Sequence, residues 1–173
     1  LDLAGSEGEA ARAAAAEDIL ARKATEFFSR GLVLGQIYVP SPVVPAEDAA
    51  IVNTDVVRYT PTAQPGARLP HILIDGGSIY DRLARNGYTL VAGAGAKTLD
   101  LKAMAACLAG DNVPFEIIEL PETQAGAYDA AYVLVRPDHH VAWRGNAPLA
   151  SAELAHLRGA SAPGGAGLMA RTA

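Results

Sequence analysis

The residues closest to a catalytic pattern lie in two glycine-rich segments. Residues 93–97 (GAGAK) follow an apolar run and precede a helical pattern, which is where a phosphate-binding loop would lie. The segment lacks the third glycine of a dinucleotide fingerprint and the G-K-S/T ending of a P-loop, so we interpret it as a turn. Residues 76–80 (GGSIY) place Ser78 after two glycines but lack the second flanking glycine of a nucleophile elbow. We interpret Ser78 as a helix cap.

Cysteine and histidine offer little further chemistry. Cys107 is the single cysteine, which excludes a C-x-x-C pair. It falls near the C-terminal end of a predicted helix, where the helix dipole disfavours a thiolate, so we expect a buried, inert thiol. His139 and His140 are adjacent and point in different directions, with no second ligand cluster nearby, so we expect exposed hairpin-tip histidines. The chain is therefore predicted to contain no catalytic, cofactor-binding or metal-binding residues.

Composition limits the classes of function. The 173 residues are 50% hydrophobic and 19% charged, which allows one domain with a core. A net charge of −5 and a pI near 5.3 argue against a nucleic-acid or anionic-membrane partner. No apolar run is long enough to cross a membrane, and the acidic, alanine-rich start does not resemble a signal peptide. We expect a cytoplasmic location, and the start at Leu1 suits a fragment of a longer protein.

Two elements and a connector are expected before the compact part of the chain. Residues 6–30 have the alanine content and apolar spacing of a helix. Residues 32–39 (LVLGQIYV) form an apolar run that predicts a strand. Residues 41–69 are rich in Pro, Ala, Asp and Thr and predict an extended connector with a short strand over 56–59. Three prolines and a glycine within 61–70 predict a surface segment without regular structure.

From Pro70 onward the pattern becomes that of a compact α/β domain. Strands are predicted over 71–74, 88–92, 115–120, 131–135 and 141–144, and helical segments over 78–83, 98–110 and 148–158. The β-α-β part should be parallel and right-handed, and the last two strands should form a hairpin. In that hairpin we expect Asp138 to accept backbone N–H bonds and Trp143 to be a large buried anchor. The element order predicts a thioredoxin-like mixed sheet with flanking helices.

Three stretches resemble one family, the class A FAD-dependent aromatic monooxygenases related to phenol hydroxylase and polyketide hydroxylases. Residues 32–42 resemble the segment that leaves the flavin domain in that family. Residues 59–71 resemble the connector that enters its C-terminal domain, which is thioredoxin-like, and residues 134–144 resemble its closing hairpin. Gln64 stands where the family often has arginine, and His139 stands where it commonly has glycine. The resemblance covers about residues 20–157.

The resemblance implies a parent enzyme that uses FAD and NAD(P)H to hydroxylate a phenolic or polycyclic aromatic ring. The family's flavin-binding motifs, the G-x-G-x-x-G and a later Gly-Asp, are missing from this chain. We therefore expect an accessory domain that serves interdomain packing or oligomerisation and is not catalytic in isolation. The alternatives are a stand-alone, non-redox binding module with the thioredoxin fold, and a one-cysteine thiol peroxidase.

The resemblance also implies an organisation for the chain. Residues 1–45 would be a helix and strand that pack on an upstream flavin domain, and residues 46–69 would be an extended connector. Residues 70–160 would be the thioredoxin-like domain and 161–173 a flexible tail. The residues expected to make interdomain contacts are Phe27, Phe28, Leu34, Tyr38, Arg68 and His71. A homodimer is the second partner that we expect.

Overall fold

The structure is a computed structural model that describes residues 4–38, 41, 44, 54–109, 114–150, 153–154 and 157. These residues fall into two units. The first, within 1–36 and 53–60, contains two helices, and we call it the helical unit. The second, within 37–52 and 61–173, contains the described strands, and we call it the sheet unit. The expected tail at 161–173 lies outside the described residues.

The helical unit contains α1 (Gly5–Phe27) and α2 (Arg30–Leu34). The predicted helix at 6–30 is confirmed through Phe27, but the strand predicted from residue 32 is wrong over Leu32–Leu34, which are helical. At Gly31 the backbone of 55–58 comes so close that an added Cβ would lie 1.8 Å from the Asp55 carbonyl oxygen. The Leu32 N–H donates to Val56 O at 3.1 Å, and these contacts fix a helical turn.

Residues 56–59 do not form the predicted short strand. The Asp55 carboxylate accepts the backbone N–H groups of Val57 and Arg58 at 2.9 and 3.0 Å, which bends the chain. These two hydrogen bonds lower the pKa of Asp55 below its ordinary 3.8. A side chain that bonds its own backbone competes with strand pairing, and here it prevails.

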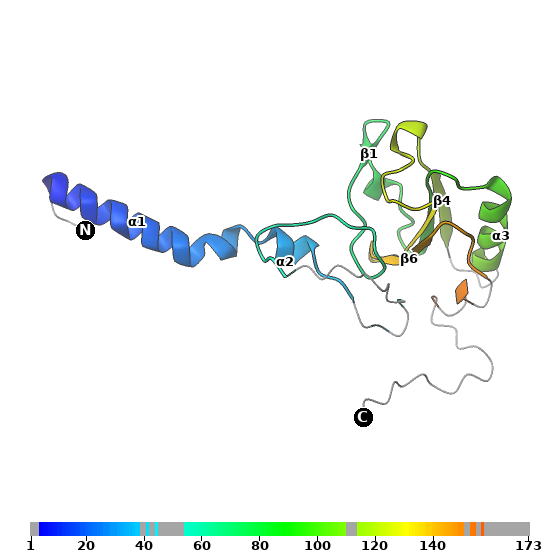
Figure 1. Ribbon diagram of the computed structural model, residues 1–173, viewed down its shortest axis with the longest axis horizontal. Coiled ribbons are helices and arrows are strands. Elements are labelled where there is room, and N and C mark those ends of the chain that lie inside the picture. Colours follow the sequence, from blue (N-terminus) through cyan, green and yellow to red (C-terminus); the bar gives the residue numbers. More distant parts are fainter. Residues whose placement is uncertain are drawn as a thin grey trace, which may run out of the picture. The chain divides into compact units, whose positions relative to one another are not determined.

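The sheet unit confirms the predicted fold class, a mixed α/β arrangement (Figure 1). Its elements are β1 (Leu73–Ile74), β2 (Gly77–Ser78), η1 (Ile79–Asp81), β3 (Tyr88–Ala92), α3 (Thr98–Ala109), β4 (Phe115–Glu119), η2 (Glu122–Gln124), β5 (Tyr132–Val135) and β6 (Val141–Gly145). The main sheet has the order β4-β3-β5-β6. β3 and β4 are parallel, and the other neighbours are antiparallel. Of the helix predicted over 148–158, residues 153–154 and 157 are helical, but the described residues 148–150 have no regular structure.

Both faces of the two central strands, β3 and β5, are buried. Leu90 and Leu134 are opposite each other in the register and pack with Met104 of α3 on one face. Val91 and Val133, the next pair, pack on the other face with residues that precede β3, such as Ile79. Successive strand residues point to opposite faces, so one continuous apolar run supplies two cores.

The last part of the connector, from residue 61 onward, packs into the sheet unit rather than lying over its surface. Ala63, Gln64, Ala67 and Leu69 are all buried. Gly66 N–H donates to Val141 O, Val141 N–H donates to Ala67 O, and Leu69 N–H donates to His139 O at 2.8–2.9 Å. The prediction of an exposed segment over 61–70 is therefore wrong. Gly66 has φ +86 and lies so close to Tyr38 that no side chain would fit, which allows this pairing.

Candidate functional site

The turn between β3 and α3 is where this topology would hold a redox cysteine or a phosphate, because a helix N-terminus favours a thiolate or an anion. Here the turn is hydrogen-bonded to the loop that precedes β5. Gly93 N–H donates to Ala131 O at 2.8 Å, and Ala94 N–H donates to Ala125 O at 2.6 Å. An added Cβ at Gly93 would lie 2.5 Å from Ala130 O. The N–H groups of Gly93 and Ala94 are therefore bonded to the loop before β5 rather than free for a ligand.

The first turn of α3 also has an internal partner. Tyr132, at 1% exposure, accepts the Lys97 N–H at 2.8 Å and donates to the Asp100 carboxylate at 2.8 Å. Burial raises the pKa of Tyr132, the Lys97 N–H partly opposes this, and Asp100 adds to it. The backbone N–H groups of Gly93, Ala94 and Lys97, which a pyrophosphate would use in this turn, are therefore already bonded within the protein.

Cys107 lies in the last turn of α3, far from that N-terminus. Its side chain is half-buried and packs against the core cluster that contains Met104 and Leu101. This position gives the thiol no help from the helix dipole. The placement does not support a thiol peroxidase.

Ser78 and His71 lie close together, but Ser78 is a helix cap. The distance between His71 Nε2 and Ser78 Oγ is 3.0 Å. Ser78 is the N-cap of η1, and its hydroxyl accepts the Tyr80 N–H at 3.1 Å. Asp75, which a triad would need as the third member, instead pairs with Arg82 at 3.0 Å. The predicted helix cap is confirmed.

Tyr80 organises a group of side chains between the connector and the hairpin turn, which we call the Tyr80 cluster: Arg68, His71, Tyr80 and His139. The Tyr80 hydroxyl donates to Leu69 O and accepts from Arg68 Nε at 3.3 Å. The Arg68 guanidinium carbon lies 5.2 Å from the centre of the Tyr80 ring. The rings of His139 and His71 lie 5.0 and 5.9 Å from that ring.

The hairpin turn positions His139 in this cluster. His139 has φ +66, the left-handed region that glycine favours, which is the residue the resembling family commonly has there. Burial lowers the pKa of His139 below 6.5, and the charge of Arg68 lowers it further. The histidines are half-buried rather than exposed as predicted. Each ring is tilted against a tyrosine ring, and the centre of the His140 ring lies 4.6 Å from that of Tyr38.

Asp138 connects the two ends of the turn. Its carboxylate accepts the His140 N–H at 3.2 Å and two bonds from the Arg136 guanidinium at 3.2 and 3.0 Å. Burial raises the pKa of Asp138, but these hydrogen bonds and the charges of Arg136 and His140 outweigh burial and leave it below 3.8. Asp138 is therefore an acceptor already satisfied within the turn.

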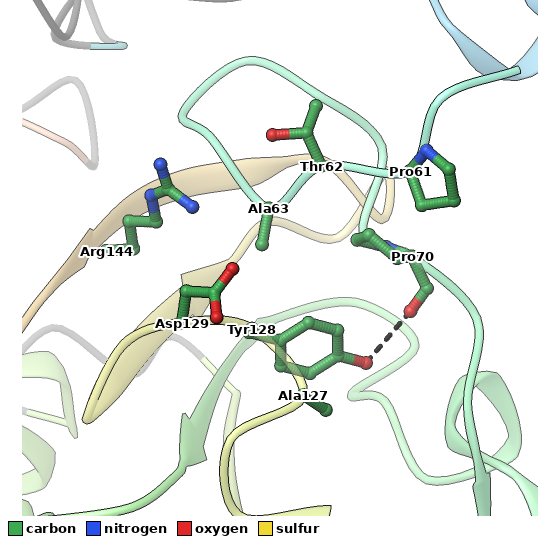
Figure 2. Close-up of a pocket in the computed structure, with 8 residues that line it drawn as sticks. All are labelled: Pro61, Thr62, Ala63, Pro70, Ala127, Tyr128, Asp129 and Arg144. Carbon is green, nitrogen blue, oxygen red and sulfur yellow. Dashed lines mark hydrogen bonds between the residues drawn. The ribbon is translucent and has the colours of Figure 1, made fainter. Parts of the chain in front are cut away.

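One small pocket lies beside the connector (Figure 2). Its volume is about 240 Å³, and its lining consists of Pro61, Thr62, Ala63, Pro70, Ala127, Tyr128, Asp129 and Arg144. Figure 2 shows the Ala63 methyl group and the Asp129 carboxylate directed toward one another, while the Tyr128 hydroxyl donates to Pro70 O at 2.9 Å. Pockets for organic ligands usually have ~300–1,000 Å³. This one is too small for a polycyclic ring.

The residues expected at an interdomain face separate into two sets. Phe27 and Phe28 of the helical unit are 79% and 59% exposed, and Leu34 is half-buried. In the sheet unit, Arg68 and His71 meet at Tyr80, and Tyr38 meets His140. The sequence did not predict the role of Tyr80. For His139 the one signal was that the resembling family commonly has glycine at this position.

Trp143 is only half-buried, so the expectation of a fully buried anchor is corrected. Its ring packs on the core cluster of the α3 face and covers Gly145, where an added Cβ would lie 2.4 Å from the ring. A strand residue near the sheet edge keeps one side of its ring toward solvent.

No group of three or more His, Cys, Asp or Glu side chains among the described residues is arranged to hold a metal ion. No helix in that part of the chain is both long and apolar enough to span a bilayer.

Comparison with known proteins shows where the chain belongs. The FAD-dependent monooxygenase apdD of Emericella nidulans is 38% identical over 128 residues, which are 68% of this chain and 20% of that protein. The structure of RebC with bound 7-carboxy-K252c is similar, with a TM-score of 0.74 and 34% identity over 92% of this chain and 30% of RebC. The flavin-dependent monooxygenase PieE, in complex with FAD and substrate, gives a TM-score of 0.66 and 26% identity over 92% of this chain and 31% of PieE.

The chain thus spans about a fifth of the curated relative and under a third of the solved ones. The match to RebC includes most of the helical unit, because residues 61–173 account for only about two thirds of the chain. The family described as "Aromatic-ring hydroxylase, C-terminal" matches residues 62–162, more than half of the sequence. This chain belongs to the aromatic-ring hydroxylase C-terminal family.

Proposed function

We propose that the chain is the accessory C-terminal part of an FAD- and NAD(P)H-dependent aromatic-ring hydroxylase of the cytoplasm, and that it is not catalytic by itself. Its role is to pack against the flavin-binding part of the same enzyme. The observation that carries this proposal is the family match over residues 62–162 in a chain that spans only a fifth of a full-length flavin-dependent relative.

The closed turn between β3 and α3 supports the non-catalytic part of the proposal. The backbone groups at 93, 94 and 97 that a phosphate would use are bonded to Ala131, Ala125 and Tyr132. Cys107 is at the opposite end of the helix from the position that activates a thiol. This arrangement supports a structural role for the domain rather than a catalytic one.

The helical unit supports the packing part of the proposal. Six of its large apolar side chains are more than half exposed: Ile19, Leu20, Phe27, Phe28, Leu32 and Val33. Large apolar patches on single proteins usually mark a surface that another domain or subunit covers. The occupant that we propose is the flavin-binding part, because the solved relatives that include this region are about three times longer than the chain.

The test is a fusion in which this chain replaces the matching fifth of the Emericella nidulans relative. We expect the fusion to retain FAD and to oxidise NAD(P)H, while the same relative without any C-terminal part loses FAD more readily. The isolated 173-residue chain should bind no FAD in titration calorimetry. Micromolar FAD binding by the chain alone, or a fusion no better than the truncated relative, would contradict the proposal.

Self-association is the second candidate for the apolar surface. A chain separated from its flavin partner must cover the same six side chains in another way, and a symmetric dimer is the commonest closed arrangement. Light scattering on the isolated chain and on the fusion distinguishes the two. We expect the chain to dimerise alone and the fusion to lose that contact.

A further inference from the structure

Arg68 has no acid to pair with in the described part of the chain. Arg68 is partly buried, its Nε donates to the Tyr80 hydroxyl, and its guanidinium carbon lies over the Tyr80 ring. Both contacts are to a neutral phenol. The nearest acid of the hairpin, Asp138, is bonded to Arg136 and to the His140 N–H. Charged side chains that are partly removed from water are usually paired, so this cation lacks a counter-charge among the described residues.

The Tyr80 cluster holds that cation in one place. The backbone of Arg68 bridges to His140, and the ring of Tyr80 and its bond to Nε hold the side chain. A guanidinium has five N–H donors in a rigid fork, and Nε uses one of them. The terminal N–H groups can therefore make the paired contact with two oxygens that arginine and carboxylates form. His71 and His139 flank the site on the same tyrosine.

We infer that the Tyr80 cluster is a carboxylate-binding site, in which Arg68 receives an Asp or Glu side chain from the flavin-binding part of the enzyme. This inference rests on the function proposed above and adds the chemistry of the contact. It assigns Arg68 the ionic contact and Tyr80 the positioning of Arg68.

The charge of the site favours a carboxylate over a phosphate. Burial and the neighbouring Arg68 lower the pKa of His139 below 6.5, so this imidazole is mostly neutral near pH 7. The cluster then offers one permanent positive charge, which matches one carboxylate. A phosphate carries about two negative charges at that pH and is better served by several cations.

The first experiment uses the fusion of the full chain with the flavin part of the Emericella nidulans relative. Arg68→Ala should shorten the half-time of FAD release on heating by about tenfold, because the partner carboxylate is left unpaired. Arg68→Lys keeps the positive charge but loses the paired N–H donors of the guanidinium. Its half-time of FAD release should lie between those of the wild type and of Arg68→Ala. Arg85→Ala is the matched control, since Arg85 is exposed in the same unit. Equal release from the Arg68→Ala and Arg85→Ala fusions would overturn the inference.

The second experiment uses the isolated chain and does not depend on the flavin partner. Hexaglutamate peptide should shift the NMR signals of Arg68 Nε and the His139 ring in a saturable way, and should raise the pKa of His139 by offsetting the Arg68 charge. Arg68→Ala should abolish the shifts, and Arg85→Ala should keep them. Inorganic phosphate at equal concentration should act more weakly. A stronger response to phosphate, or no saturable response to the peptide, would overturn the carboxylate assignment.

The two experiments separate the failures. A wild-type fusion that does not hold FAD contradicts the proposed function, and the peptide titration still decides whether the cluster binds carboxylates. The isolated chain could bind the peptide at Arg68 while FAD release from the fusion is unchanged by Arg68→Ala. That pair of results would contradict the inference that the flavin-binding part supplies the carboxylate.

Discussion

The helical unit and the sheet unit place their large apolar side chains in opposite ways. In the sheet unit, Leu69, Ile79, Leu90 and Leu134 are completely buried. In the helical unit, Phe27 is 79% exposed and Val33 is 68% exposed, and Gly31 is the buried residue of α2. The large apolar side chains of the sheet unit form a core. Those of the helical unit are mostly exposed.

This difference indicates where each unit obtains its stability. Burial of apolar area is the main favourable term in folding, so the sheet unit is stabilised from within. Most of the stability of a helix in a protein comes from tertiary packing of its apolar face rather than from helix propensity. The surface pairs within α1, Arg22 with Asp18 and Lys23 with Glu26, add only ~0.3–0.5 kcal/mol each. The large apolar side chains of the helical unit, which are mostly exposed, therefore contribute less to its stability than the buried side chains of the sheet unit contribute to theirs.

The largest effect is expected from a change in the core of the sheet unit. Leu134→Ala removes a completely buried side chain at the centre of β5 and should cost about 2–5 kcal/mol in the free energy of unfolding. Urea unfolding followed by the fluorescence of Trp143, the one tryptophan, measures this. Ile117→Ala on β4, where the side chain is 39% exposed, is the control and should cost less than about 1 kcal/mol. Equal costs would mean that the sheet has no dominant core.

A smaller effect is expected at the edge of the same core. Trp143→Ala should cost about 2 kcal/mol, below the ~3–5 kcal/mol typical of a fully buried tryptophan, because the side chain is only partly buried. Gly145→Ala should also destabilise, since its Cβ would lie 2.4 Å from that ring. Because the ring causes the clash, Gly145→Ala should be nearly harmless once Trp143 is alanine, and thermal unfolding of the double variant tests that. Additive costs would place the clash elsewhere.

The sheet unit was also the part that the sequence predicts well. Tyr132–Val135 is a continuous apolar run of strand length, and Tyr88–Ala92 is a similar run that only Thr89 interrupts. The apolar residues of α3 have helical spacing between turn signals. The strand order β4-β3-β5-β6 could not be read in advance, because it depends on pairing between distant segments. The helix at Leu32–Leu34 was missed because a short apolar run looks the same in a strand and in a helix.

The candidate site shows a similar division. Arg68 and His71 were expected to matter through the family resemblance, which placed them at a junction. Tyr80 was not expected, because its contacts with Leu69 and His139 depend on tertiary packing that no local pattern encodes. Prolines and a glycine in residues 61–70 predicted an exposed segment, although the glycine is what lets that segment enter the sheet unit.

An intermediate effect is expected at the hairpin turn that joins the sheet unit to the Tyr80 cluster. His139 has φ +66, which costs a non-glycine residue ~1–2 kcal/mol. His139→Gly and His139→Ala both lose the ring contact with Tyr80, but only glycine relieves the backbone. The glycine variant should therefore be the more stable by about 1 kcal/mol in thermal unfolding, after allowing for its extra unfolded-state entropy. A more stable alanine variant would contradict the strain.

The same two variants test the pH dependence. The folded-state pKa of His139 lies below the ordinary 6.5, so the unfolded chain binds the proton more readily. The contribution of His139 to stability is therefore complete above pH 6.5 and is lost as the pH falls through the lower folded-state value. Urea midpoints at pH 7.5 and 5.5 should differ more for the wild type than for either variant. An equal pH dependence would assign the effect to other groups.

The smallest effect on stability, and the sharpest test of the comparison between the units, is expected at Phe27 and Phe28. The double change to alanine removes two rings that are 79% and 59% exposed, so the unfolding monitored at Trp143 should shift by less than about 0.5 kcal/mol. Self-association should weaken at the same time, since these rings belong to the apolar surface of the helical unit, and light scattering over a concentration series would detect it. Leu20→Ala, 63% exposed on α1, is the single-residue control for that surface. A large loss of stability with unchanged association would mean that the chain covers these rings itself. That result would contradict the proposal that the helical unit packs against the flavin-binding part.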